Sequence, residues 1–424
     1  MASVNSFTDY GFLKRMYSGV IRTSLNNDLP LYSRLEDVLD QVNIGGAGLY
    51  WGVRMGRHHG THAIGEDATI STPTRATEKQ AAATPAEVWG QAQLTAKVMA
   101  MAKNSADAFE TAVTNEMQNL MESTKQTLGR QVIGNKVSGN ANVGILGLVV
   151  GTVSGSATVP VDNCNPTQFY PGQLLVIGTA AELDAATGVA AVVSSVSVTT
   201  ATSCTLTMTA SVTLADNDLI AEGTNASATS NGYTRELVGL NHIVDNAGTL
   251  FDIDPTTYTK WKATVHSASS QPWSEKLLNT LLVAIRTKAG REKLPNVLAM
   301  HDLTYLEFEE DKRPDRRYVA KELAQGFEDR NPQYTFMDAV LEEVMDPWVQ
   351  VGSILAVNTK VLGMAWPQPL DFFDADGNDR LRVANKTTVQ FIYGGIGQMV
   401  AFERHCHGRL DSISVDLTNI QLRE

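Results

Sequence analysis

Residues 187–214 read TGVAAVVSSVSVTTATSCTLTMTASVTL and lie within a window, 137–234, that contains no lysine and no arginine. The whole chain has 424 residues and 34 Lys+Arg, so the composition changes abruptly at both edges of this window. Inside it, apolar and polar side chains alternate from Cys204 to Leu214, as expected of a half-buried strand. Short strands at this spacing predict a separately folded β barrel or sandwich over residues 137–230.

The totals of charge and cysteine restrict the class of protein. A formal net charge of -12 argues against a dedicated nucleic-acid binder, which would carry a basic patch. Three cysteines are too few for a disulfide scaffold and fit a reducing compartment. Cys164 and Cys204 share the β-rich window, so one disulfide between them stays open. Because no signal peptide and no membrane span of roughly 20 apolar residues is visible, we expect a protein made and kept in a cytoplasm.

The first 84 residues are too polar to form a core of their own. Residues 1–44 predict an arm that packs on something else, with one amphipathic stretch at helical spacing. Residues 45–84 are rich in glycine and contain a short alternating stretch, which predicts a long two-stranded excursion. An isolated ribbon of this kind is marginal in water, so we expect it to need a partner surface. The apolar positions are Leu31, Leu35, Val38, Leu39 and Val42 in the arm, and Leu49, Trp51, Val53 and Met55 in the excursion.

A long helix is predicted directly after this excursion. Thr84, Pro85 and Glu87 fit a capping box with proline at the first helical position. Apolar residues then recur at steps of three and four until Gly134, which predicts a helix roughly 70 Å long. The pattern favours a spine lying on a sheet over a two-stranded coiled coil. Its expected packing residues include Val98, Phe109, Val113, Met117, Leu120 and Leu128.

From Arg235 onward the composition is that of an ordinary α+β domain. Residues 273–288 predict an amphipathic helix that ends at Gly290, and Asp302 is expected to cap a second, shorter helix through Glu310. Residues 296–300, 349–358, 387–393 and 399–405 have the pattern of strands.

Three clusters could in principle carry metal chemistry, but each lacks part of the required pattern. His58, His59 and His62 lie in a glycine-containing extended segment without the glutamate of a zinc protease motif. The acidic run 374–379 fails the calcium-loop pattern at its sixth and twelfth positions. In residues 405–407, alternation on a strand would separate the two histidines from Cys406. Since no nucleophile or phosphate-binding signature occurs in a usable context, we expect no enzyme, no metal and no cofactor.

The order of arm, glycine-rich loop, long helix, β insert and α+β domain resembles the major capsid proteins of tailed bacteriophages, with the Hong Kong 97-type fold. The resemblance covers nearly the whole chain and has no single invariant motif. It is carried by GLYWGVRMGRHHGTHAIGEDATI (48–70), the helix pattern 86–134, TRELVGLNHIVDN (234–246), VGSILAVNTKVLGM (351–364) and VQFIYGGIGQMVAFERHCHGRL (389–410).

The resemblance implies an α+β subunit that assembles as hexamers and pentamers into an icosahedral head around double-stranded DNA. It also implies a separate scaffolding protein, a portal and decoration proteins as partners, and no lysine crosslink, because residues 45–78 contain no lysine. The implied division is N-arm 1–44, extended loop 45–84, peripheral domain with spine helix 85–136, inserted domain 137–230, peripheral return 231–261, axial domain 262–365 and C-terminal strands 366–424.

Within that frame, the extended loop would lie on the neighbouring subunit. Aromatic anchors and complementary charges are the groups expected at such a contact. The candidates are Tyr50, Trp51, Arg54, Arg57, Glu66 and Arg75. Two rival hypotheses are a metal-dependent enzyme that uses His58, His59 and His62, and a surface-binding protein built on the β module.

Overall fold

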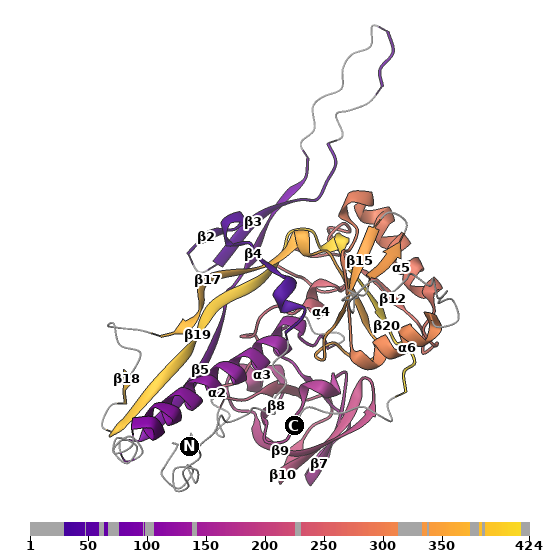
Figure 1. Cartoon of the computed structure of the whole chain (residues 1–424). Helices are drawn as coiled ribbons and strands as arrows, with labels where there is room; N and C mark the ends of the chain where they lie inside the picture. Colours follow the sequence, from indigo (N-terminus) through magenta and orange to yellow (C-terminus); the bar gives the residue numbers. More distant parts are fainter. Residues whose placement is uncertain are drawn as a thin grey trace, which may run out of the picture.

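The structure is a computed structural model that describes residues 29–46, 48–58, 63–66, 76–95, 97, 106–137, 142–224, 230–312, 333–336, 339–373, 381–383 and 386–416. Side chains of residues 106–115 lie outside this description. Figure 1 shows a long sheet with one helix along it, a small barrel below, and a second sheet with helices to the right. A narrow ribbon projects upward from the junction between the two sheets.

The lysine- and arginine-free window forms the barrel. Six strands close it in the order β10-β7-β6-β11-β8-β9. They are β6 (Gly147–Val149), β7 (Val153–Asp162), β8 (Leu174–Gly178), β9 (Val189–Thr200), β10 (Ser203–Leu214) and β11 (Leu219–Glu222). The interior is an apolar cluster of its own that includes Val159, Phe169, Leu206 and Ile220. A short helix, α3 (Ala180–Asp184), begins with a capping box between Thr179 and Glu182.

The long sheet is built around one central strand, β19 (Thr388–Ala401). Strand β5 (Ala86–Thr95) pairs with it antiparallel on one side. On the other side lie β17 (Leu362–Phe372) and β18 (Leu381–Arg382), and β1 (Glu36–Asp37) extends the sheet next to β17. Helix α2 (Ala106–Ile133) lies along β5 and β19, as Figure 1 shows.

The predicted helix start at Thr84 is wrong. Residues 86–95 form β5 instead, and α2 has 28 residues, which corresponds to about 42 Å rather than 70 Å. The reason is tertiary pairing, because β19 offers backbone partners from Thr95 opposite Thr388 to Ala86 opposite Gly397. A local capping signal contributes about 1 kcal/mol and is readily overridden by a full ladder of this length.

The projecting ribbon is a three-stranded sheet at its base. Strand β3 (Gly48–Arg54) pairs antiparallel with β2 (Asn43–Gly45) and with β4 (Glu78–Ala83). The predicted alternation is present, and Leu49, Trp51, Val53 and Met55 are all buried in the main core of the same chain. The base of the ribbon therefore has the partner surface that was expected, and the same chain supplies it.

The predicted helical stretch in the arm is also absent from the described residues 29–46. Two 3-10 turns, η2 (Tyr32–Arg34) and η3 (Leu39–Gln41), flank β1 there. Leu31, Val38 and Val42 are buried in the main core, each from a different local conformation. Burial of the same residues could be read from the sequence, but the conformation that achieves it could not.

The second sheet has six strands in the order β12-β20-β16-β13-β15-β14. Its helices are α5 (Glu275–Ala289), which ends at Gly290 with φ of 86°, and α6 (Asp302–Lys312), close to the predicted bounds. The predicted strand 399–405 is wrong beyond residue 401, because residues 404–406 form a 3-10 turn, η8 (Arg404–Cys406). The strands are β12 (Thr264–Ser267), β13 (Val297–Met300), β14 (Gln333–Phe336), β15 (Ala339–Met345), β16 (Ile354–Val357) and β20 (Gly408–Asp411).

Candidate functional site

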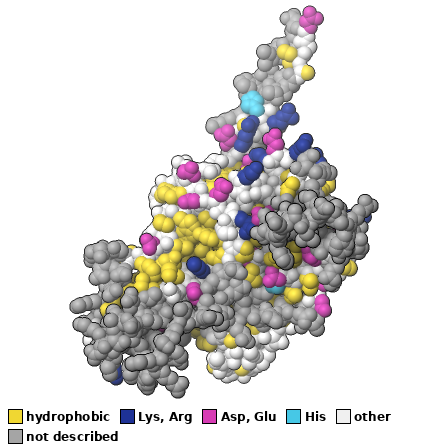
Figure 2. Space-filling view, viewed as in Figure 1, with side chains coloured by type: hydrophobic (Ala, Val, Ile, Leu, Met, Phe, Trp, Pro, Cys, Tyr) yellow, Lys and Arg dark blue, Asp and Glu magenta, His cyan; other side chains and the backbone are white. Residues whose placement is uncertain are grey.

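The projecting ribbon carries the exposed charges that the sequence singled out. Figure 2 shows Lys and Arg side chains gathered along the lower half of the projection, with acidic side chains among them. Arg54, Arg57 and Glu66 are exposed, and Arg54 lies opposite Glu78 in the register of β3 and β4. Among the residues that the structure describes, neither Arg54 nor Arg57 forms an ion pair. These guanidinium groups are therefore accessible to a partner.

The two predicted aromatic anchors have different surroundings. Tyr50 is half-buried, and its hydroxyl lies 3.0 Å from the position that a Cβ on Gly48 would occupy. Trp51 is only 4% exposed and packs edge-to-face on Phe251, with ring centroids 5.0 Å apart. Because Trp51 belongs to the core of its own chain, we leave it out of any contact with another copy.

Lys79, a further cation in the described part of the ribbon, is engaged within the chain. The Lys79 ammonium lies 5.3 Å from the centre of the Tyr258 ring, a cation–π arrangement. Several predicted residues fall outside the described part of the chain. They are Arg75, His59 and His62 in the loop, Val98 before α2, and the acidic run 374–379.

Two of the predicted packing residues of the long helix face the sheet or the core. Leu120 and Leu128 are buried, whereas Met117 is partly exposed. A Cβ on Gly90 of β5 would lie 2.7 Å from Cδ1 of Leu120, so the glycine allows the helix to approach the strand closely. Phe109 and Val113 lie in α2, but their side chains are outside the described set.

The barrel is fixed to α2 by a buried guanidinium that sequence reasoning missed. Arg130 is 3% exposed and donates hydrogen bonds to Glu236 at 2.6 and 3.0 Å and to Glu222 of β11 at 2.5 Å. Burial alone would lower the pKa of Arg130, but the two carboxylates raise it above its usual value. The only sequence signal was an arginine in the last turn of the helix, with one acid, Glu222, inside the lysine- and arginine-free window and another, Glu236, just after it.

Amides complete the junction between the barrel and the rest of the chain. Asn165 donates from Nδ2 to the carbonyl oxygen of Trp348 at 2.8 Å. Gln350 donates from Nε2 to the carbonyl oxygen of Ala201 at 3.1 Å. Polar groups in such a junction determine orientation, because each buried donor needs its partner in place. Beside the junction lies a cleft of about 990 Å³, whose lining includes Trp89 and Asp252.

The cluster 403–407 is the place where metal-ligating atoms meet in the described part of the chain. Glu403 Oε2 accepts a hydrogen bond from Cys406 Sγ at 3.3 Å and lies 3.7 Å from His405 Nε2. The other carboxylate oxygen pairs with the Lys293 ammonium. His407 instead accepts a hydrogen bond at Nδ1 from the backbone of Asn358, at 3.2 Å. The turn at η8, rather than a strand, is what brings His405 and Cys406 together.

Burial is the largest cause of the pKa shifts of Cys406 and His405 in this cluster. It raises the pKa of Cys406 to about 12, an effect strengthened by the Glu403 carboxylate, and it lowers the pKa of His405. The ammonium groups of Lys293, Lys260 and Lys288 also lower the pKa of His405. The Glu403 carboxylate is thus engaged within the chain by the Cys406 thiol and the Lys293 ammonium.

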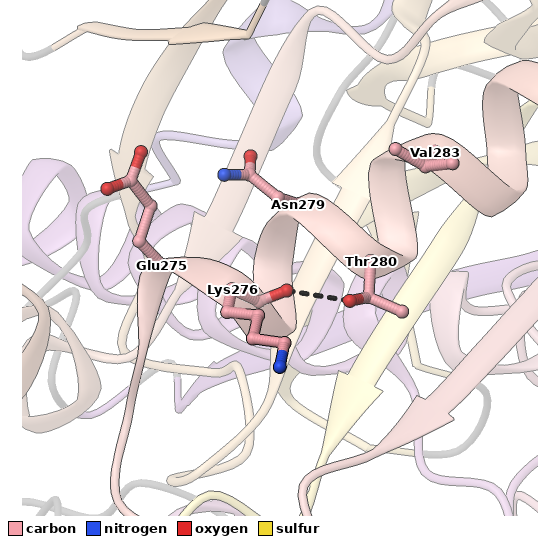
Figure 3. A pocket seen from close by; sticks show the side chains of 5 residues that line it. All are labelled: Glu275, Lys276, Asn279, Thr280 and Val283. Carbon is pink, nitrogen blue, oxygen red and sulfur yellow. Dashed lines mark hydrogen bonds between the residues drawn. The ribbon is translucent and has the colours of Figure 1, made fainter.

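A shallow hollow on the outer face of α5 is lined by side chains of that helix. Figure 3 shows Glu275, Lys276, Asn279, Thr280 and Val283 along the helix, with the Thr280 hydroxyl donating to the carbonyl oxygen of Lys276 at 2.7 Å. The Tyr334 hydroxyl lies within hydrogen-bond distance of Glu275 Oε1 and of Asn279 Oδ1, at 3.1 and 2.8 Å, so these two polar groups are engaged within the chain. The hollow is a surface feature of the helix.

Within the described residues, no helix has both the length and the apolar character needed to cross a bilayer.

Comparison with known proteins gives a consistent result at the level of the fold. No family model and no curated protein matches the sequence. Among solved structures, the cyanophage A-1(L) capsid asymmetric unit is similar, with a TM-score of 0.55, 10% identity, and coverage of 93% of this chain and 95% of that chain. The capsid of a native GTA particle gives 0.50, 11% identity, and coverage of 97% and 100%. This chain has the fold of tailed-phage major capsid proteins.

Proposed function

We propose that this chain is a structural capsid subunit that assembles as hexamers and pentamers into the icosahedral head of a tailed phage around double-stranded DNA. The observation that carries the proposal is the similarity over 93% of the chain to a capsid subunit, which leaves no large part of the fold unaccounted for. A net charge of -12 suits a wall that lies near DNA, because a basic surface would bind the phosphates strongly.

The proposed contact between subunits is the exposed face of the ribbon, with Arg54, Arg57 and Tyr50 against the neighbouring copy. Support comes from the exposure of the two guanidinium groups, whereas the apolar residues that alternate with them in β3 are buried in the same chain. Arg75 and Glu66 would add to the same surface. Many modest contacts of this kind gain strength through repetition in a closed shell.

The same proposal assigns each part of the chain to a domain of the capsid subunit. The second sheet with α5 and α6, within 262–365, would be the axial domain, and the long sheet with α2 would be the peripheral domain. The barrel, within 137–230, would decorate the outer surface. A separate scaffolding protein, a portal and decoration proteins would be the partners, with assembly in the bacterial cytoplasm.

The direct test is expression of the chain with and without a candidate scaffolding protein, followed by sedimentation and negative-stain microscopy. We expect closed shells of uniform diameter in at least one of the two preparations. A soluble monomer in both preparations, at concentrations where capsid proteins assemble, would contradict the proposal.

The two rival hypotheses make different predictions from those of a capsid subunit. The metal-dependent enzyme with His58, His59 and His62 predicts stoichiometric zinc in the purified protein, and the surface-binding protein predicts a ligand for the isolated barrel. Metal analysis of the same preparation distinguishes the first of these from a capsid subunit.

A further inference from the structure

Two free thiols meet inside the barrel. Cys164 follows the end of β7, and Cys204 is the second residue of β10. Their Sγ atoms are 3.6 Å apart, and each residue is only 1% exposed. The backbone holds the two chain segments in register, because Cys164 donates its N–H to the carbonyl oxygen of Thr202 at 3.1 Å. This backbone hydrogen bond holds the corner after β7 beside the start of β10, where the two sulfur atoms meet.

The two thiols lie in apolar surroundings, where each is a close neighbour of the other. Both belong to the apolar core cluster of the barrel. Cys164 also points its Sγ toward the carbonyl oxygen of Thr202 at 3.5 Å, and a Cβ on Gly147 would lie 2.8 Å from its own Cβ. The neighbouring thiol and burial raise the pKa of Cys164 above its ordinary value. Cys164 is thus kept as a thiol, and both cysteines lie in a close-packed site with little space for a bulky reagent.

We propose that Cys164 and Cys204 form a redox-modification site, in which hydrogen peroxide oxidises the pair to an intrachain disulfide. One sulfur gives up its proton and attacks the O–O bond, so that a sulfenic acid forms and the hydroxide that leaves takes up the proton as one water. The second sulfur displaces the hydroxyl group as a second water, so that two S–H bonds are replaced by one S–S bond. Two electrons pass from the thiols to the peroxide, which is fully reduced. Closing the bond requires the sulfurs to approach by about 1.5 Å.

The bond would link the corner after β7 to β10 across a loop that contains β8, α3 and β9. A crosslink over such a loop stabilises chiefly by restricting the unfolded chain, so we expect the oxidised barrel to unfold at a higher temperature. If the proposed function holds, this disulfide would form after the particles leave the reducing interior of the cell.

The sequence provides a convenient assay, because trypsin has no site between Lys136 and Arg235. Purified folded chain is treated with hydrogen peroxide, quenched with catalase, denatured, alkylated with N-ethylmaleimide and digested. We expect peptide 137–235 to lose two hydrogens, about 2 Da, and to take no alkyl group until it is reduced. Cys406 falls in a different peptide and is the internal control, since its sulfur contacts a carboxylate and no other thiol.

The variants Cys164→Ser and Cys204→Ser should each abolish the mass loss, while Cys406→Ser should leave it unchanged. Alanine replaces serine where the buried hydroxyl prevents folding.

Persistence of two alkylatable thiols in the folded wild type, or oxygen addition to each sulfur without a bond, would overturn the proposal. The measurement uses the isolated chain and is independent of shell formation. Its failure would therefore leave the proposed capsid role untouched, and the converse also holds.

Discussion

At the scale of single residues, the buried Arg404 side chain donates hydrogen bonds to four backbone carbonyl oxygens. It is fully buried, and its guanidinium donates to the carbonyl oxygens of His242, Ile243, Ala247 and Gly248 at 3.0–3.3 Å. Two of these carbonyls lie at the end of helix α4 (Leu240–Ile243), where a positive charge is favourable. Burial without a carboxylate among the described partners lowers its pKa to about 10.

Replacing this side chain should therefore destabilise the fold strongly. We expect Arg404→Met to lower the free energy of unfolding by about 3 kcal/mol or more, because four carbonyl groups lose their donor inside the core. The matched control is Arg409→Met, which removes a partly exposed guanidinium paired with Asp411 and should cost less than about 1 kcal/mol. Urea unfolding followed by circular dichroism measures both. Equal effects of the two substitutions would contradict this assignment.

Two buried histidines predict how stability depends on pH. Burial, the largest cause, and nearby cations lower the pKa of His242 and of His407 to about 3. In the unfolded chain a histidine titrates near pH 6.5, so below that pH the unfolded state binds protons that the folded state does not. Stability is then complete above about pH 6.5 and is lost as the pH falls toward 3.

Each of these histidines should reduce the free energy of unfolding by about 1.4 kcal/mol per pH unit within that window. Urea titrations between about pH 7.5 and 5 test this above the range in which most carboxylates titrate. The variant His407→Gln should retain about half of the slope. A flat profile in the wild type would show that neither imidazole is kept neutral by the fold.

At the scale of elements, the pairing of β5 with β19 is the feature that the sequence predicted wrongly, and it can be tested directly. A Cβ on Gly394 of β19 would lie 2.0 Å from the carbonyl oxygen of Val88 in β5. We expect Gly394→Ala to cost roughly 1–3 kcal/mol, because the ladder must separate to admit the methyl group. Gly52→Ala in β3 is the control, since nothing lies within 4 Å of its added Cβ and it should be neutral.

Differential scanning fluorimetry of the two alanine variants provides the readout. A loss of stability confined to Gly394→Ala supports the strand. If residues 86–95 were helical, Gly394 would have no neighbouring carbonyl, and its substitution would be as mild as that of Gly52.

The second prediction at this scale is that the barrel can be removed without unfolding the rest of the chain. Its entry and exit lie side by side, since Thr234 donates its N–H to the carbonyl oxygen of Val143 at 3.0 Å. Removing residues 144–232 and joining the ends through a short glycine linker should leave both sheets folded, because the barrel has its own core. Arg130 would lose Glu222 but retain Glu236.

We expect the shortened chain to show cooperative thermal unfolding by circular dichroism at a moderately lower temperature. Loss of the contacts that Val137 and Tyr233 make with the barrel explains the decrease. Global unfolding of the shortened chain at room temperature would mean that the barrel is an integral part of the fold.

At the scale of the whole molecule, the exposed cations of the ribbon should matter only when copies meet. We expect Arg54→Glu combined with Arg57→Glu to abolish or strongly impair shell formation while leaving the circular dichroism spectrum and thermal unfolding unchanged. Both side chains are exposed and unpaired within the described residues, so their reversal costs little in the monomer. Sedimentation and electron microscopy give the readout.

The matched control is the pair Arg54→Lys and Arg57→Lys, which retains the charge and should retain assembly, particularly at low ionic strength. Normal particles from the charge-reversed chain would remove these two residues from the proposed contact. The proposal of a capsid subunit would then have to rest on another surface.

The sequence by itself determined the elements whose signals are local. Composition located the barrel, a 3.6-residue period and Gly290 located α5, and alternation identified the buried face of β3. Tertiary structure alone decided that residues 86–95 pair with β19, that Trp51 packs on Phe251 of the same chain, and that Arg130 and Arg404 are buried. Those outcomes depend on partners roughly one hundred to three hundred residues away in the sequence. A local sequence pattern contains no information about such partners, because only folding brings them close.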